Sequence, residues 1–145
     1  MEIKIQKLKD NAIIPKRATD GSAGMDLYAC IEQPITIQPQ QRVTIPTGIA
    51  VALPSNEFAT FIFARSGLGI KHGIALSNGV GVIDSDYRGE LCVGLLNSSN
   101  IPYTINPNDR VAQMVVMPVC VPAVNVVDTL DETNRNTGGF GSTGK

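Results

Sequence analysis

Apolar and polar residues alternate with a period of two along several short stretches of the chain. The alternation is clearest over residues 49–53, where Ile49, Val51 and Leu53 are separated by two alanines. Successive side chains of a strand point to opposite faces of its sheet, so this pattern predicts β-strands. No stretch keeps a helical period over three turns. The predicted strands begin near Ile3 and cover residues 25–30, 35–38, 43–45, 49–53, 60–64, 80–83, 91–96, 111–119 and 121–127.

Glycine and proline, with 14 and 9 residues, divide the chain into short segments. Many short strands separated by such turns are typical of an all-β sandwich or barrel. The sequence predicts at most one short helix, of one or two turns, over residues 66–71. We expect residues 1–130 to form a single β domain. Residues 131–145 are polar and glycine-rich, with Phe140 as their only large apolar residue, and are predicted to be a flexible C-terminal arm.

Composition and charge narrow the class of protein. A chain of 145 residues with 43% hydrophobic and 17% charged residues can build one globular core. The net charge of −1 gives no broad basic surface, which argues against sequence-independent nucleic-acid binding. The N-terminus has interspersed lysines and neither a signal pattern nor a long apolar run. We therefore expect a cytoplasmic protein that does not associate with membranes.

The three cysteines are widely spaced and form no CxxC pair. Their odd number and spacing argue against a zinc site and against a disulfide framework. Cys30, Cys92 and Cys120 each lie in an apolar run, so each is predicted to be a reduced core residue. His72 is the only histidine, which excludes a histidine-rich metal site.

The segment 78–91 combines an apolar run, acidic residues, an aromatic residue and three glycines. We interpret it as a β-hairpin whose tip carries Asp84, Asp86, Tyr87 and Arg88, since Asp-Ser-Asp after an apolar run is a strong turn signal. An acid beside an aromatic side chain at the mouth of an apolar pocket suits a general base and a flat ligand. The alternative is an ordinary solvated β-turn, in which aspartate is common for backbone reasons.

Five segments of the chain, in order, resemble the five motifs of the trimeric dUTP diphosphatases (dUTPases). The third motif is matched by GVIDSDYRGEL, which contains the hairpin tip. Together the segments span residues 23–145, and five motifs in the right order are a specific signal. They are AGMDLYA (23–29), ARSGLG (64–69), GVIDSDYRGEL (81–91), NDRVAQMV (108–115) and RNTGGFGSTGK (135–145).

This resemblance implies a jelly-roll-like β domain that hydrolyses dUTP to dUMP and pyrophosphate, which keeps uracil out of DNA and supplies dUMP for thymidylate synthesis. Asp84 would be the base that activates water for attack on the α-phosphorus. Asp86 is interpreted as a turn residue. Tyr87 would lie under the deoxyribose and exclude a 2′-hydroxyl by steric clash. The alternative for Tyr87 is an aromatic residue that covers the edge of the core.

The resemblance also assigns recognition of the base to the same segment. Asn78 would recognise uracil, because its amide offers both a donor and an acceptor. Backbone groups of Gly81, Val82 and Ile83 would complete the recognition and exclude cytosine. Glycine at position 81 and at the neighbouring position 79 permits close approach of the backbone to a ligand.

The phosphates would be bound by other motifs. Arg65, Ser66 and Gly67 would form an anion cradle at the start of the short helix, although a turn with Ser66 as helix N-cap is an alternative. Gln113, a polar residue in an apolar strand, would contact the α-phosphate. Asp26, which by itself is readable as a turn-end or as a salt-bridged residue, would lie near Arg110 and reach Mg²⁺ through water. The ion would bind mainly to phosphate oxygens and water.

The fifth motif implies that the arm closes over the nucleotide. Phe140 would stack on uracil and Arg135 would meet the γ-phosphate, while Gly141, Ser142 and Thr143 would surround the phosphates. Asn108 and Asn136 stand where the family usually has glycine. Asparagine tolerates left-handed backbone better than most residues, so we expect the local geometry to be retained.

Three other interpretations compete with dUTP hydrolysis. A dCTP deaminase-like enzyme would share the fold, and a dUTPase-like nucleotide-binding or signalling module would keep the site without turnover. A jelly-roll interaction module such as a lectin would not explain the glycine-rich arm. The dUTPase resemblance further implies a homotrimer with active sites shared between subunits.

Overall fold

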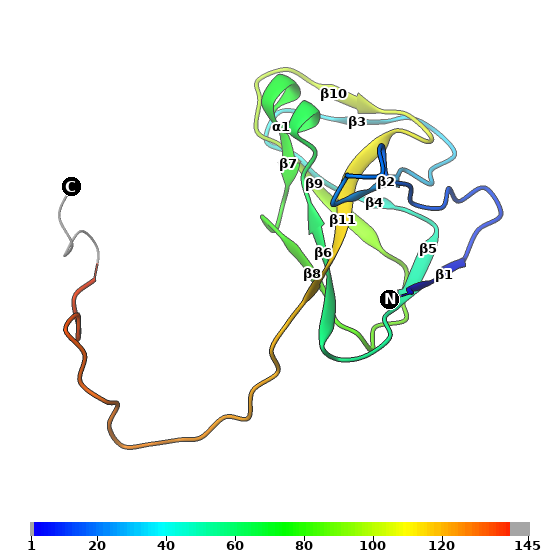
Figure 1. Cartoon of the computed structure of the whole chain (residues 1–145). Helices are drawn as coiled ribbons and strands as arrows, with labels where there is room; N and C mark the ends of the chain where they lie inside the picture. The colour runs from blue at the N-terminus through cyan, green and yellow to red at the C-terminus, as the bar shows by residue number, and fades with distance from the viewer. Residues whose placement is uncertain (1, 140–145) are drawn as a thin grey trace.

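A computed structural model of the protein describes residues 2–139 and shows a jelly-roll-like β fold with one short helix (Figure 1). This confirms the fold class predicted from the sequence. The elements are β1 (Lys4–Lys7), β2 (Met25–Tyr28), β3 (Ile35–Ile37), β4 (Arg42–Pro46), β5 (Ile49–Ala52), β6 (Phe58–Phe63), α1 (Ser66–His72), β7 (Ile74–Leu76), β8 (Gly81–Ile83), β9 (Cys92–Asn97), β10 (Tyr103–Ile105) and β11 (Arg110–Pro118).

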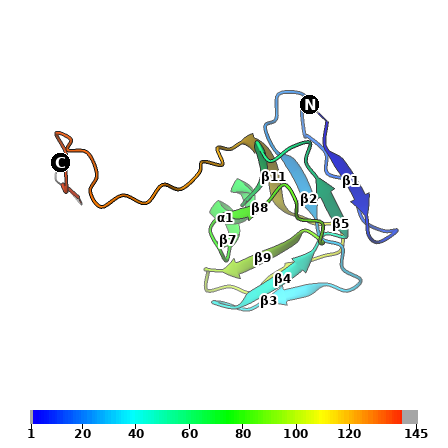
Figure 2. The same ribbon diagram turned by 90° about the horizontal axis from the view of Figure 1, so that it is seen from below.

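The strands form one larger sheet, one smaller sheet and two ribbons, all paired antiparallel. The four-stranded sheet has the order β2-β11-β6-β8, and the three-stranded sheet has the order β4-β9-β7. The ribbons are β1-β5 and β10-β3. Figure 2 shows β3, β4 and β9 on one side of the body and β2, β8 and β11 on the other. The core therefore lies between these two layers.

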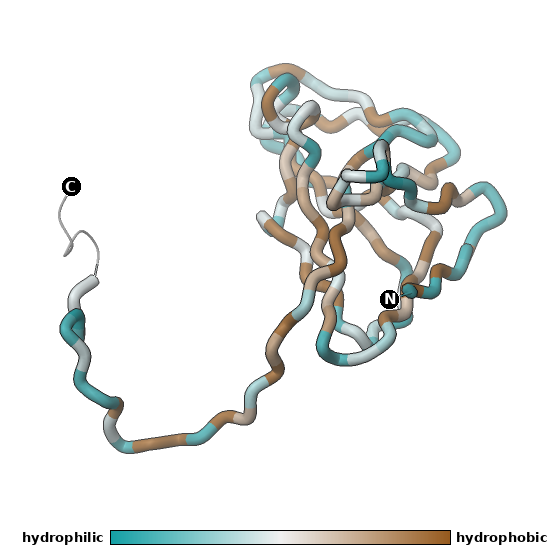
Figure 3. The backbone as a smooth tube through the Cα atoms, viewed as in Figure 1, coloured by the Kyte–Doolittle hydropathy of each residue, from teal (hydrophilic) through white to brown (hydrophobic). Residues whose placement is uncertain are grey.

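The core is built from apolar side chains that the strands turn inward. Leu27 of β2, Ile45 of β4, Val93 of β9 and Met114 of β11 are almost completely buried. Burying each such side chain contributes roughly 1.5–3 kcal/mol to folding. In Figure 3 the strands of the body are mostly hydrophobic, whereas the loop between β1 and β2 is mostly hydrophilic.

The predicted helix over residues 66–71 is confirmed. Arg65, with extended backbone, is the N-cap of α1, so Ser66 is the first helical residue and not the cap. The helix ends at Gly73, whose left-handed φ of 67° is favourable for glycine. Lys71 and His72 lie in the last turn, where cations interact favourably with the helix dipole.

The predicted hairpin over residues 78–91 is wrong. Strand β8 pairs with β6, and the next strand, β9, pairs with β4 and β7. Residues 84–91 therefore link two different sheets. Local sequence signals identify strands and turns but not pairing partners, and consecutive strands pair only about two times in three. The short strands β7 and β10 were also missed.

The strand predicted over residues 121–127 is wrong as well. Residues 119–139 have no regular strand or helix and lead away from the body in Figures 1 and 2. Val124 and Val126 are 89% and 91% exposed. The valine-rich pattern suits a strand, but a strand needs a partner, and within residues 2–139 none pairs with this segment.

Two further expectations have clear outcomes. Cys30 is buried as predicted, whereas Cys92 and Cys120 are exposed, so their assignment to the core is wrong. Cys92 is exposed because alternate residues of a strand can face solvent, and Cys120 because it lies beyond the end of β11, in the segment without regular structure. Asn108 and Asn136 have φ of 68° and 42°, which confirms the expected left-handed backbone at both positions.

No helix within residues 2–139 is long and apolar enough to span a membrane.

Candidate active site

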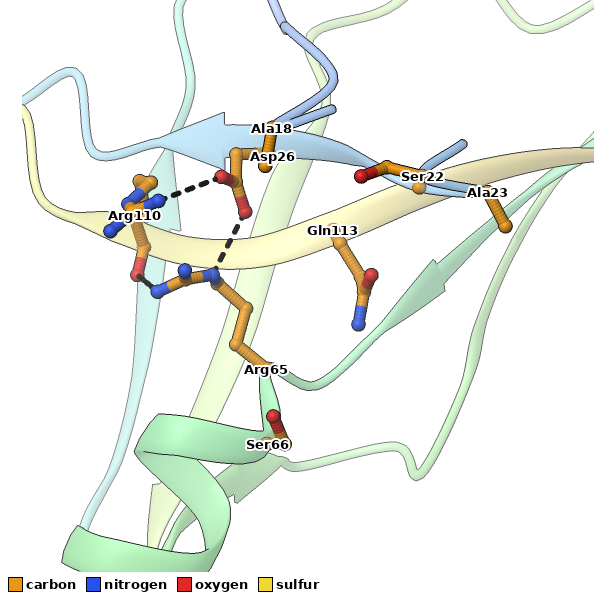
Figure 4. Close-up of a pocket in the computed structure, with 9 residues that line it drawn as sticks. Ala18, Ser22, Ala23, Asp26, Arg65, Ser66, Arg110 and Gln113 are labelled. Carbon is orange, nitrogen blue, oxygen red and sulfur yellow. Dashed lines mark hydrogen bonds and ion pairs between the residues drawn. The ribbon is translucent and has the colours of Figure 1, made fainter. Parts of the chain in front are cut away.

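A polar cavity of about 350 Å³ lies where β2, β6 and β11 meet the start of α1 (Figure 4). Its centre is Asp26, which Figure 4 shows between two arginine side chains. Arg65 Nε donates to Asp26 Oδ1 at 2.8 Å, and Arg110 Nη1 donates to Oδ2 at 3.2 Å. The three residues come from β2, the N-cap of α1 and the start of β11, and are brought together only by the fold. The salt-bridged interpretation of Asp26 is therefore confirmed.

The charges at this centre favour an anion. One carboxylate faces two guanidinium groups, which leaves a formal charge of +1. Asp26 and Arg65 have side chains only 14% and 26% exposed, whereas Arg110 is 50% exposed. The ion pair between Asp26 and Arg65 is thus shielded from solvent. The remaining N–H groups of the two arginines are available for bidentate hydrogen bonds to a carboxylate or phosphate.

Gln113 and Ser66 line the same cavity, as the sequence predicted for one binding site. Gln113 Nε2 donates to the carbonyl of Ala64 at 3.1 Å, which orients the amide. A Cβ at Gly24 would lie 2.5 Å from Gln113 Oε1, so a larger residue at position 24 would displace the Gln113 amide from this orientation. Within residues 2–139 the Ser66 hydroxyl makes no hydrogen bond, and it is free to donate to a ligand.

A second, smaller cavity of about 110 Å³ lies between β8 and β9. Asn78, Gly81, Val82 and Ile83 line it, which brings together the residues predicted to recognise a base. Because β8 and β9 pair with other strands, neither closes this gap with hydrogen bonds to the other. A flat ring could therefore enter between them and meet backbone groups of β8. Cys92 also lines the cavity, and no sequence signal pointed to it, because it reads as an ordinary apolar strand residue.

Asp84 and Tyr87 lie on the exposed link between β8 and β9 and line neither cavity. The Tyr87 N–H donates to the Asp84 carbonyl at 3.2 Å, which forms the predicted turn. Tyr87 is 45% exposed, and its hydroxyl donates to the carbonyl of Glu90 at 3.2 Å. Within one chain the candidate base is therefore not placed in the arginine-rich cavity.

The remaining predicted residues are scattered. Gly67 lies in the first turn of α1 with open space where a side chain would project. Arg135 lies in the extended tail, where its Nε donates to the carbonyl of Gly138 at 2.9 Å. Phe140, Gly141, Ser142 and Thr143 lie outside the described residues.

Within residues 2–139 two groups, Cys92 and Tyr103, have a clearly shifted pKa, and neither is a predicted catalytic group. Burial raises the pKa of the Cys92 thiol, the Glu90 carboxylate raises it further, and Lys9 lowers it. The thiol is thus a weak nucleophile at neutral pH. Burial raises the pKa of Tyr103, with a further increase from Asp109 and a decrease from Arg65.

The described part of the chain offers few ligands for a metal ion. Residues 2–139 contain no cluster of three or more His, Cys, Asp or Glu side chains that could hold one. Both oxygens of Asp26 already accept hydrogen bonds from arginine. Each oxygen keeps a second lone pair, so Asp26 fits a metal-bound water better than direct coordination.

Comparison with known proteins identifies the relatives of this fold and site. The dUTPase family model matches residues 10–144. The deoxyuridine 5′-triphosphate nucleotidohydrolase of Desulfitobacterium hafniense is 53% identical over 131 residues, which cover 90% of this chain and 87% of the relative. The enzyme of the same name from Paraburkholderia phymatum is 47% identical over 145 residues, which cover 100% and 98%.

Solved structures show the same fold at lower sequence identity. The dUTPase of Staphylococcus bacteriophage 80α, in a mutant form with dUpNHpp, has a TM-score of 0.85 at 22% identity and covers 99% of each chain. A mutant dUTPase from phage phi11 of S. aureus has a TM-score of 0.82 at 23% identity and covers 91% of this chain and 100% of the phage chain. The latter structure was described with a structural Mg(II) ion.

Proposed function

The chain belongs to the dUTPase family, and we propose that it hydrolyses dUTP to dUMP and pyrophosphate. The observation that carries the proposal is the cavity in which Asp26 orients Arg65 and Arg110 beside Gln113 and Ser66. A net positive cavity with several directed donors suits a triphosphate. The motifs that supply these residues are the ones that match the family.

We propose that a water molecule attacks the α-phosphorus. A bond forms between the water oxygen and phosphorus, the bond from phosphorus to the bridging oxygen breaks, and pyrophosphate leaves. Asp84 accepts the proton of the water. Arg65, Ser66 and Gln113 hold the phosphates and stabilise the charge that develops on them.

The family implies that Mg²⁺ accompanies the triphosphate, and the residues present fit such an ion. The phosphate oxygens and water would supply most of its ligands, with Asp26 reaching it through water. The chemistry that the ion supplies when bound is neutralisation of phosphate charge. No step of the mechanism requires a further protein ligand.

The separation of Asp84 from the arginine-rich cavity supports a shared site. We propose a homotrimer in which one subunit provides the cavity at Asp26 and a neighbour provides Asp84, Tyr87 and the cavity at Asn78. Such an arrangement would bring the base to the phosphates without any change in the fold. The tail would complete the site through Arg135 and the residues that follow it, and residues 131–145 stay our prediction for the arm. A cytoplasmic location also stays a prediction.

In the base-binding cavity, Asn78 and the backbone of Gly81, Val82 and Ile83 would recognise uracil. The amide of Asn78 can pair with a carbonyl and an N–H of the base at once. Tyr87 would contact the deoxyribose and leave no room for a 2′-hydroxyl. A volume of about 110 Å³ favours a single ring over a fused pair of rings.

The alternatives are less well supported, because the relatives found over nearly the whole chain are named as dUTP nucleotidohydrolases. The purified protein should be incubated with dUTP and, separately, with dCTP in the presence of Mg²⁺. Pyrophosphate from dUTP is the expected result. Ammonia from dCTP would support a deaminase, and binding without release of either product would support a nucleotide-binding module.

A further inference from the structure

Among the hydrogen bonds of residues 2–139, those that attach the link between β8 and β9 to the body all go to the turn between β4 and β5 and the first residue of β5. Glu90 Oε1 accepts a hydrogen bond from the Gly48 N–H at 2.7 Å. The Leu91 N–H donates to the Ile49 carbonyl at 2.8 Å, and the Leu91 carbonyl accepts from the Thr47 N–H at 3.2 Å. The Thr47 hydroxyl donates to the same Leu91 carbonyl at 2.5 Å. Glu90 is the only side chain of the link that joins it to this turn among the hydrogen bonds of residues 2–139.

The turn that receives Glu90 is a rigid point of attachment. Gly48 has φ of 69°, and a Cβ there would lie 2.7 Å from both Ala12 Cβ and Cys30 Sγ. The Gly48 carbonyl also accepts a hydrogen bond from the Leu8 N–H at 2.8 Å. Thr47 is 1% exposed. The turn is therefore closely packed on one side, and its Gly48 N–H donates to Glu90.

Glu90 is in turn connected to Tyr87. The Tyr87 hydroxyl donates to the Glu90 carbonyl at 3.2 Å. The ring lies against Gly89, where an added Cβ would overlap the Tyr87 hydroxyl and ring carbons. The ring is therefore held between a glycine that leaves room for it and the Glu90 carbonyl, whose peptide unit is bonded to Ile49 through the Leu91 N–H and whose residue is further held by the Glu90 side chain.

We propose that Glu90 is a positioning residue that sets the orientation of the Tyr87 ring and, through it, the discrimination between deoxyribose and ribose. The inference rests on the proposed role of Tyr87 as the group that contacts the sugar. A steric gate works only if the ring cannot move aside when a 2′-hydroxyl arrives. The bonds of Leu91 attach the end of the link to the buried turn, and the bond from Glu90 to Gly48 adds the resistance closest to the Tyr87 ring.

A purely structural role for Glu90 makes a different prediction. Loss of a half-buried hydrogen bond would lower the melting temperature and would reduce the hydrolysis of dUTP and UTP by the same factor. A positioning role changes the ratio of the two efficiencies, because only UTP gains from a mobile ring. The ratio of kcat/KM for dUTP to kcat/KM for UTP is therefore the readout.

The test compares four variants of the full chain with the unaltered protein. Glu90→Ala removes the acceptor, and we expect the dUTP-to-UTP ratio to fall about tenfold, the effect of losing one ordinary hydrogen bond. Glu90→Gln keeps a carbonyl acceptor and should restore most of the ratio. Glu32→Ala is the matched control, since Glu32 is exposed and makes no hydrogen bond within residues 2–139. Tyr87→Ala should lower the ratio more than any other variant.

The outcomes separate the two proposals. If Tyr87→Ala leaves the ratio unchanged, Tyr87 is not the gate, and the proposed function of that residue fails. If Tyr87→Ala lowers the ratio but Glu90→Ala does not, the gate stands and the role of Glu90 is overturned. Circular dichroism of each variant checks the fold. If Glu90→Ala does not fold, Glu90→Asp takes its place, because the shorter side chain draws the carboxylate away from the Gly48 N–H, and an unchanged ratio in that variant would overturn the role of Glu90.

Discussion

The cavity at Asp26 and the link at Asp84 are built in opposite ways. The cavity depends on bonds between side chains, since Asp26 meets Arg65 39 residues away and Arg110 84 residues away along the chain. In the link, every hydrogen bond found within residues 2–139 has a backbone group as at least one partner, and the Asp84 carboxylate has no hydrogen-bond partner there. A change of side chain in the cavity should therefore alter both stability and binding, whereas one at Asp84 should alter chemistry alone.

The largest expected effect comes from Asp84→Asn. Removing the base should lower kcat by about 10²–10⁴-fold, the usual contribution of general base catalysis. The melting temperature should stay nearly unchanged, because the exposed carboxylate makes no bond that the amide loses. Steady-state kinetics and thermal denaturation measure the two quantities. Asp86→Asn is the control in the same turn, and equal losses in the two variants would contradict the assignment of Asp84.

The same variant tests whether the two regions meet across subunits. The Asp84→Asn and Arg65→Ala variants should be mixed, denatured and refolded together. Arg65→Ala is expected to be inactive because it lacks the guanidinium in the cavity. If neighbouring subunits share a site, about a quarter of the sites would combine an intact Asp84 with an intact Arg65, since each position fills at random. Activity well above that of either variant is expected, and its absence would place both residues in the same subunit.

The Asp26→Ala substitution should have a smaller effect on activity than Asp84→Asn, but it should also lower stability. Asp26→Ala leaves two arginines without their shared acceptor and should lower the free energy of unfolding by about 2–3 kcal/mol, less than for a fully buried pair. The KM for dUTP should rise, because the guanidinium groups lose their orientation. Urea denaturation measures the first quantity. Asp86→Ala, on the exposed link, should change stability by less than about 0.5 kcal/mol.

The smallest effect is predicted in the sheet behind the cavity. The Thr60 hydroxyl is buried and has no hydrogen-bond partner within residues 2–139. Thr60→Val keeps the shape of the side chain and removes this unpaired group, so the free energy of unfolding should rise by about 1 kcal/mol. Activity should not change. A clear loss of stability would show that the hydroxyl is satisfied, for example by a buried water molecule.

The comparison of the cavity at Asp26 with the link at Asp84 also shows which parts of the fold and site could be predicted from the sequence. The residues around Asp26 could be grouped through the motif resemblance. The left-handed backbone at Asn108 was expected because the family usually has glycine there and asparagine tolerates this conformation. The hairpin failed because the pattern around Ile83 and Cys92 describes two strands without saying which neighbours they take. The role inferred for Glu90 had no signal, because an acid after a glycine reads as an ordinary strand start, and its partner Gly48 lies 42 residues away.

The gap between β8 and β9 has a mechanical consequence. Its walls belong to different sheets, so its width is set by how the two layers pack and not by hydrogen bonds between its own strands. β8 is a three-residue strand at the edge of its sheet, and it can move outward at little cost. A pyrimidine bound in the gap would contact both layers and reduce their motion relative to each other. Ligand binding would then stiffen the whole body, and slower amide hydrogen exchange in both layers would report it.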